Sequence, residues 1–163
     1  QLKIELGDFF LIPEGGSNEL AVKGVEQFTK ELDTPTDYIC CPVGTGGTMA
    51  GIIRGLDGNK NIIGFSSLKN GSFLNKEVAA LAVKAYANWE IRTEYHFGGY
   101  AKTTPSLEVF IERFTELHRI PLEFIYTGKM MWGIFDLAAK GFFKKGSTIL
   151  AIHTGGIHRS QSH

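Results

Sequence analysis

The chain has 163 residues, 43% of them hydrophobic, and its 17 basic residues balance 17 acidic ones. This length and apolar content exclude a disordered protein and suffice for one domain with a hydrophobic core. The balanced, dispersed charge argues against nucleic acid or an anionic membrane as a partner, and no apolar run has the length of a membrane span, so we expect a cytoplasmic protein.

Short apolar runs alternate with segments of helical periodicity along the chain. Strands are predicted at residues 9–13, 38–43, 62–68, 91–97 and 148–153. Helices are predicted after Ser17, after the glycine-rich residues 44–48, over 76–88, from Pro105, and over 128–140. This alternation predicts an α/β fold, with a parallel sheet covered by helices on both faces. We expect this domain to occupy residues 1–156, followed by a polar tail over 157–163.

Several side chains have an expected place in this fold. Ser17 is predicted to cap the first long helix. The apolar face of that helix is predicted to contain Ala21, Val25, Phe28 and Leu32. The adjacent Cys40 and Cys41 cannot join distant segments, so we expect reduced core residues. Lys129 is expected in solvent. No histidine has partners at ligand spacing, so no metal is expected.

Glycine-rich turns follow the predicted strands, at residues 14–17, 44–48, 98–100 and 154–156. The carboxyl ends of parallel strands lie at one edge of a sheet, where ligands of α/β proteins bind. The sequence therefore predicts a small-molecule site formed by these turns.

The turn with the clearest chemistry consists of Gly44, Thr45, Gly46, Gly47 and Thr48. A strand, a glycine loop and a helix start together make an anion site, since the first helical turn has unpaired N–H groups. The loop lacks the lysine of a nucleotide-binding P-loop, and it lacks the last glycine of a dinucleotide fingerprint. It therefore suits a single phosphate, although a tight turn that only packs strand against helix is the alternative.

Four motifs occur in order: residues 12–18 (IPEGGSN), 44–48 (GTGGT), 126–129 (YTGK) and 152–156 (IHTGG). Together they resemble the pyridoxal-phosphate family of 1-aminocyclopropane-1-carboxylate (ACC) deaminase and D-cysteine desulfhydrase. The resemblance extends from about Phe10 to Gly156. It implies a tryptophan-synthase-beta-like fold, known as fold type II, and pyridoxal 5'-phosphate as the cofactor.

The resemblance also implies roles for individual residues. The loop over 44–48 would bind the cofactor phosphate, Thr154 would face the pyridine nitrogen, and Tyr100 would be an active-site tyrosine that positions substrate. The deaminase branch has a glutamate soon after that tyrosine, whereas Glu108 here lies too far along and on a predicted helix. The resemblance therefore favours desulfhydrase-like chemistry, which releases ammonia and a 2-oxo acid from a small amino acid.

Members of this family hold the cofactor through a lysine in an N-terminal segment, as a Schiff base. Lys23, Lys69, Lys102 and Lys129 stand in other motifs. We therefore expect the chain to be the C-terminal portion of such a lyase and inactive alone. The expected partner is a second copy or the missing N-terminal half. The alternative is a non-catalytic anion-binding or regulatory module.

Overall fold

The structure, a computed structural model, describes residues 2–32 and 34–156. Four strands form one parallel sheet in the order β3-β2-β1-β4. They are β1 (Tyr38–Val43), β2 (Asn61–Ser66), β3 (Trp89–Arg92) and β4 (Ile149–Ala151). Tyr38 opens β1 opposite Asn61 on one side and Ile149 on the other. The predicted α/β fold with a parallel sheet is therefore confirmed.

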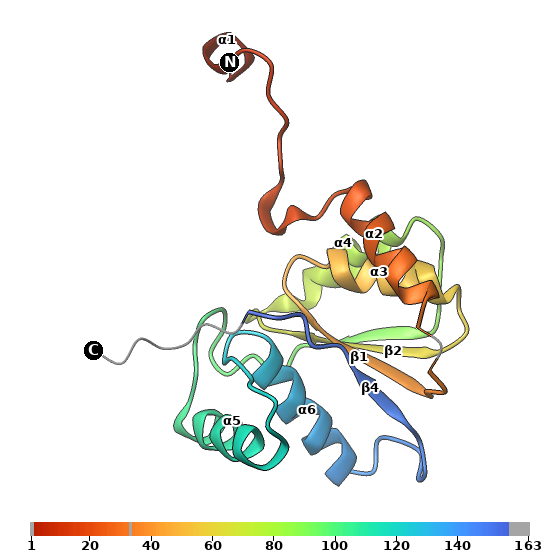
Figure 1. Ribbon diagram of the computed structural model, residues 1–163, viewed down its shortest axis with the longest axis vertical. Helices are drawn as coiled ribbons and strands as arrows, with labels where there is room; N and C mark the ends of the chain where they lie inside the picture. Colours follow the sequence, from red (N-terminus) through yellow and green to blue (C-terminus); the bar gives the residue numbers. More distant parts are fainter. Residues whose placement is uncertain (1, 33, 157–163) are drawn as a thin grey trace.

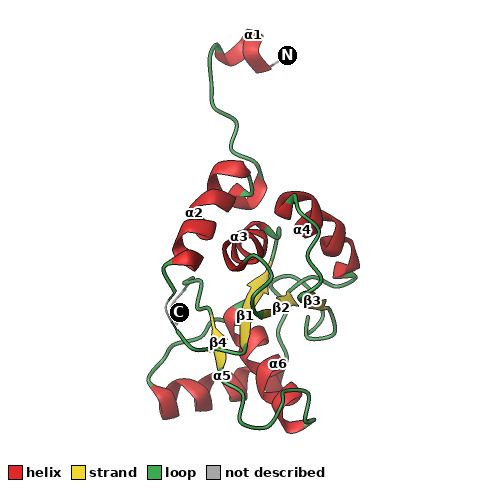
Figure 2. Ribbon diagram, turned by 90° about the vertical axis from the view of Figure 1, so that its right-hand side faces the viewer, coloured by secondary structure: helices red, strands yellow, loops and turns green. Residues whose placement is uncertain are grey.

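Helices cover both faces of this sheet (Figures 1 and 2). The first face has α3 (Gly47–Leu56) and α4 (Leu74–Ala82), with α2 (Glu19–Lys30) packed on α3, and the second has α5 (Pro105–His118) and α6 (Thr127–Ala139). The remaining helical pieces are α1 (Leu2–Leu6) and the 3-10 turns η1 (Glu14–Gly16) and η2 (Gly71–Phe73). Among the described residues, no helix is long and apolar enough to cross a membrane.

Burial on both faces explains why the central strands are continuously apolar. Cys41 and Ile62 point into the core beneath α3 and α4, while Cys40 and Ile63 point into the core beneath α6. Alternate residues of a strand face opposite sides, so a strand between two helical layers needs apolar residues at every position. Both cysteines are free and buried, as predicted.

The predicted strand over 9–13 is wrong. This segment lies in an arm that leads from α1 to η1 and projects from the body (Figure 1). Phe10, Leu11 and Ile12 are 71%, 71% and 69% exposed. A strand requires a neighbour that pairs with its backbone, and within residues 2–32 and 34–156 the four paired strands all lie elsewhere. The other predicted elements form, but α4 begins and ends earlier than residues 76–88, β3 begins and ends earlier than residues 91–97, and β4 is shorter than residues 148–153.

The first long helix differs from its prediction in two ways. Its cap is Asn18, whose side-chain oxygen accepts from Ala21 N at 2.9 Å, in place of Ser17. Its buried residues are Val22 and Thr29, whereas Ala21 and Phe28 are exposed. The buried stripe is displaced because α2 packs mainly on α3.

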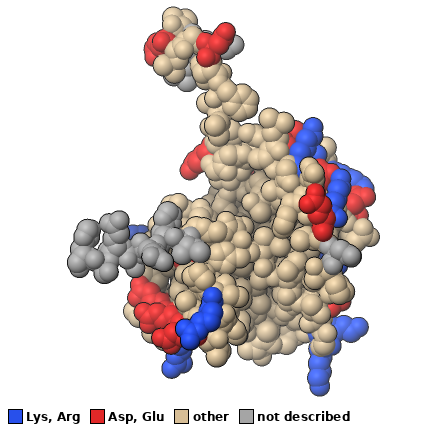
Figure 3. All heavy atoms as spheres, viewed as in Figure 1, with Lys and Arg blue, Asp and Glu red and all other residues tan. Residues whose placement is uncertain are grey.

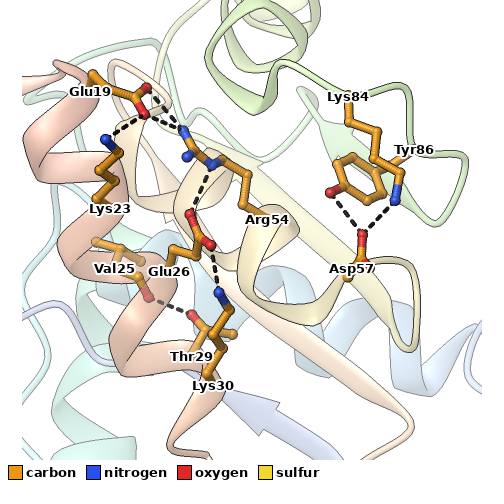
Figure 4. Close-up of polar contacts among 10 residues, drawn as sticks. All are labelled: Glu19, Lys23, Val25, Glu26, Thr29, Lys30, Arg54, Asp57, Lys84 and Tyr86. Carbon is orange, nitrogen blue, oxygen red and sulfur yellow. Dashed lines mark hydrogen bonds and ion pairs between the residues drawn. The ribbon is translucent and has the colours of Figure 1, made fainter.

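The seam between α2 and α3 depends on small residues. A Cβ atom on Gly51 would lie 2.5 Å from Val25 Cβ and 2.8 Å from Val22 O. At the seam's edge, Arg54 pairs with Glu19 and Glu26, each at 3.0 Å (Figure 4). The glycine on α3 therefore allows a backbone approach that no other residue permits.

We predict that Gly51→Ala lowers the free energy of unfolding by about 1–3 kcal/mol, since overpacking forces the two helices apart. Gly24→Ala on α2 is the matched control, because a Cβ there would meet nothing within 4 Å. That change should stabilise the protein by about 0.5–1 kcal/mol through the helix propensity of alanine. Urea denaturation of both variants measures the contrast, and equal effects would refute the tight seam.

Candidate functional site

The site lies where the winding of the sheet reverses. β1 and β4 are neighbours, but α3 follows β1 on one face of the sheet while α6 precedes β4 on the other (Figure 1). At such a switch point a crevice opens beyond the carboxyl ends of the two strands. A cleft of about 230 Å³ is found there, lined by residues 44–48, by Thr154 and by residues 15–17.

The glycine loop presents the start of α3 to this cleft. Gly46 precedes the helix with a φ of 92°, and no side chain caps it. The N–H groups of the first turn therefore have no partner within the helix, and the helix dipole adds partial positive charge there. This uncapped turn, open to a cleft, fits a phosphate group.

The turn over 14–17 completes the wall of the cleft. The hydroxyl oxygens of Ser17 and Thr45 lie 2.5 Å apart. A Cβ on Gly47 would lie 2.7 Å from Ser17 Oγ, and a Cβ on Gly15 would lie 2.5 Å from Thr45 Oγ1. Ser17, predicted to cap a helix, is therefore a contact between the two glycine turns, and it adds a hydroxyl to the cleft.

Thr154 reaches the same cleft from the end of β4. Its turn is held by His153, whose Nε2 lies 2.9 Å from Pro121 O and whose Nδ1 accepts from Gly155 N at 3.1 Å. The structure thus brings the loop over 44–48 and Thr154 together, although 106 residues separate Thr48 from Thr154. Glu108 lies on a helix, α5, as expected, and its side chain is exposed.

Tyr100 lines a neighbouring cavity of about 490 Å³. This cavity shares Gly15, Gly44, Thr45 and Tyr126 with the first cleft. The rings of Tyr100 and Tyr126 are 6.0 Å apart between centroids, in an edge-to-face arrangement. Tyr100 therefore lies beside the first cleft, with Tyr126 between the two spaces.

Tyr126 is a site residue that the sequence analysis missed. It borders both cavities, and a Cβ on Gly44 would lie 3.1 Å from its ring. Burial raises the pKa of Tyr126 to about 12, with the neighbouring Tyr100 hydroxyl as the second cause. Its phenol is therefore protonated at neutral pH and can donate a hydrogen bond. The YTGK motif contained the signal, because its tyrosine lies two residues before the predicted helix over 128–140.

Glu123 holds Tyr126 in place and was also missed. Its buried carboxylate accepts from the backbone N–H groups of Tyr126 at 2.8 Å and Thr127 at 2.6 Å, and from that of Ile125. The Thr127 hydroxyl also donates to it, at 3.1 Å. Glu123 thus satisfies the donors that the start of α6 would otherwise leave unpaired.

The expectation of a solvent-exposed Lys129 is wrong. Its side chain is 1% exposed, and Nζ donates to Gly99 O at 2.7 Å. Burial lowers the pKa of Lys129, and the charge of Glu123 partly opposes that effect. The first turns of α6 face the protein interior, so the lysine meets a carbonyl of the loop that carries Tyr100. Within the described residues, no group of three or more His, Cys, Asp or Glu is arranged to hold a metal ion.

Comparison with known proteins agrees with this geometry. Residues 2–155 match the family described as "Pyridoxal-phosphate dependent enzyme". A Pyrococcus horikoshii protein named "Putative 1-aminocyclopropane-1-carboxylate deaminase" is 33% identical over 171 residues, which cover 96% of this chain and 52% of that protein. Klebsiella pneumoniae D-cysteine desulfhydrase is 28% identical over 164 residues, which cover 90% and 50%.

A solved structure gives the same result. The crystal structure described as "Crystal Structure Analysis of the ACC deaminase homologue" matches with a TM-score of 0.79 at 32% identity, covering 96% of this chain and 52% of that one. The chain spans about half the length of the curated relatives that it matches. The chain therefore belongs to the family of pyridoxal-phosphate-dependent enzymes, as a homologue of ACC deaminase and D-cysteine desulfhydrase.

Proposed function

We propose that this chain is the C-terminal, phosphate-binding portion of a pyridoxal-phosphate-dependent lyase of the desulfhydrase and deaminase type. The observation that carries the proposal is that the uncapped start of α3 and Thr154 border one cleft at the switch point of the sheet. Members of this family use pyridoxal phosphate. The cleft contains hydrogen-bond donors that suit the phosphate group of this cofactor.

The N–H groups over 44–48, with the Thr45 and Thr48 hydroxyls, would bind the phosphate ester. Thr154 would offer its hydroxyl to the pyridine nitrogen. Pyridoxal phosphate, when bound, supplies the electron sink for breaking bonds at the α carbon of an amino acid.

The tyrosines would act on the substrate side of this site. Tyr100 and Tyr126 line the larger cavity, which adjoins the phosphate loop through Gly44 and Thr45. Tyr100 would orient the substrate, and the Tyr126 phenol would hold a proton near it. A hydroxyl such as that of Thr154, in place of a carboxylate, leaves a ring nitrogen largely unprotonated. We therefore favour D-cysteine over ACC as the substrate, with ammonia, sulfide and a 2-oxo acid as products.

The complete site would need a lysine from outside these motifs, so we propose that these residues function together with a further surface that supplies it. Two features support this. Phe10, Leu11 and Ile12 are exposed, and they belong to the arm that projects from the body (Figures 1 and 3). Lys129, the lysine closest in sequence to Tyr126, is buried and donates to Gly99 O. The partner is the other half of the fold or a second copy, and the chain alone would be inactive.

The proposal is tested by titrating the 15N-labelled protein with pyridoxal phosphate and, separately, with inorganic phosphate. We expect the amide signals of residues 44–48 to shift with both ligands, and the Thr154 signal to shift only with the cofactor. Thr45→Val keeps the shape of the side chain and removes one hydroxyl donor. It should weaken phosphate binding about tenfold, the effect of one charge-assisted hydrogen bond.

Thr148→Val is the matched control, since Thr148 is exposed and lies at the opposite end of β4. It should leave both titrations unchanged. Shifts with phosphate alone would favour the anion-binding module. Shifts with neither ligand at millimolar concentration would refute the proposed site.

A further inference from the structure

The loop that carries Tyr100 has a strained backbone. In this Tyr100 loop, residues 97–101, φ is 51° at Phe97, 98° at Gly98, 126° at Gly99 and 52° at Ala101. The left-handed region is unfavourable for phenylalanine and alanine, and such strain persists only where surrounding contacts impose it. Some contact must therefore hold the loop.

His96 accepts from Gly98 N through its Nδ1 and from Gly99 N through its carbonyl, and the contact that reaches another element is made at the carbonyl of Gly99. This oxygen accepts from Lys129 Nζ at 2.7 Å and from the backbone N–H of Lys102 at 3.1 Å. The Gly99 carbonyl belongs to the same peptide group as the nitrogen of Tyr100. Holding this carbonyl therefore also holds the backbone nitrogen of Tyr100. A charged donor makes the stronger of the two bonds.

The start of α6 also holds the backbone of Tyr126. Lys129 lies three residues after Tyr126, within the first turns of α6. The Glu123 carboxylate accepts from Tyr126 N at 2.8 Å, so the backbone of Tyr126 is tied to that end as well. The start of α6 is therefore hydrogen-bonded to the carbonyl that precedes Tyr100 and contains Tyr126 itself, and the two tyrosine rings lie 6.0 Å apart.

We propose that Lys129 is a positioning residue, which clamps the Tyr100 loop to the start of α6 and so sets the arrangement of the Tyr100 and Tyr126 rings. A role of Lys129 in catalysis rests on the proposed function, in which both tyrosines face the substrate. The clamp itself is a property of the protein without any ligand.

The test is Lys129→Met, which fills the same volume without a donor. NMR of tyrosine-labelled protein at pH 7 should show a ring-to-ring nuclear Overhauser effect between Tyr100 and Tyr126 in the wild type. The variant should lose it, and should keep the effect between Tyr38 and Phe143, whose rings are 5.0 Å apart and pack against the core beneath α6. Loss of the first effect alone is the expected result, and its retention would overturn the inference.

A second readout separates positioning from electrostatics. The groups that act on the Tyr126 pKa are Tyr100, Glu123 and Glu14, together with burial. Releasing Tyr100 should expose Tyr126 and lower its pKa toward the usual value of about 10. Removing a nearby positive charge would by itself raise that pKa. A Tyr126 signal that begins to titrate below pH 10 only in Lys129→Met therefore supports the clamp, and a raised pKa contradicts it.

Two further variants complete the comparison. Lys102 directly follows the Tyr100 loop, and its side chain is exposed. Lys102→Met removes a positive charge there and should change neither the ring-to-ring nuclear Overhauser effect nor the pKa of Tyr126. Lys129→Arg keeps a charged donor and should retain the ring contact. If Lys129→Met does not fold, a scalar coupling between Lys129 15Nζ and the Gly99 carbonyl carbon in the wild type decides the question, since its absence would refute the clamp. None of these measurements uses cofactor, so a failed cofactor titration would leave the clamp standing.

Discussion

Replacing Glu123 with alanine is expected to lower the free energy of unfolding by about 4 kcal/mol, among the largest effects of single substitutions. The carboxylate accepts from three consecutive backbone N–H groups, those of Ile125, Tyr126 and Thr127, and from the Thr127 hydroxyl. Glu123 and Thr127 are both buried, so water cannot easily replace the lost acceptor. Each buried donor left unsatisfied costs about 1–3 kcal/mol.

Two variants show whether the cost comes from these hydrogen bonds. Glu123→Gln keeps one acceptor oxygen at the same reach, so it should cost about half as much as the alanine change. Glu112→Ala removes an exposed carboxylate from α5 and should change stability by less than about 0.5 kcal/mol. Urea denaturation measures all three. Equal losses for alanine and glutamine would show that the capping bonds contribute little.

Local patterns were sufficient to predict the parallel sheet and the glycine-rich turn that precedes α3. The continuous apolar run of β1 and the glycines that follow it specify a buried strand and a helix start over adjacent residues. Thr154 could also be placed beside this loop, because parallel strands end at one edge. The start of α5 is equally local, since Thr104 accepts from Leu107 N and Pro105 occupies the first turn.

Features that depend on distant partners could not be predicted in this way. Burial of Lys129 depends on the Gly99 carbonyl, 30 residues away in the chain. The buried face of α2 depends on the glycines of α3, which admit Val22 and Thr29 and leave Phe28 outside. The apolar run over 9–13 has the composition of a strand, but pairing requires a neighbour that a single segment does not contain. The errors at Lys129 and α2 arose where a tertiary contact overrides a local preference, whereas the error at residues 9–13 arose because no strand of the described residues pairs with that segment.

Raising the pH from 7.5 to 10 is expected to lower the free energy of unfolding by about 3–4 kcal/mol because of Cys40 and Cys41. Burial raises the pKa of Cys41 to about 12 and raises that of Cys40 even further. In the unfolded chain both thiols ionise near pH 8.5. Above that pH the folded protein binds more protons than the unfolded chain, so stability falls as pH rises toward the folded pKa values.

A comparison with Cys40→Ala/Cys41→Ala isolates this effect. The double variant loses some core packing at every pH, but its stability should decline much less between pH 8.5 and 10. Lys129 affects the pH dependence of stability in the opposite direction, because burial lowers its pKa. Both proteins retain Lys129, so its effect cancels in the comparison. Urea denaturation with a reductant present measures the two slopes. Parallel pH profiles would mean that the thiols ionise without unfolding, and that the core beside β1 admits water.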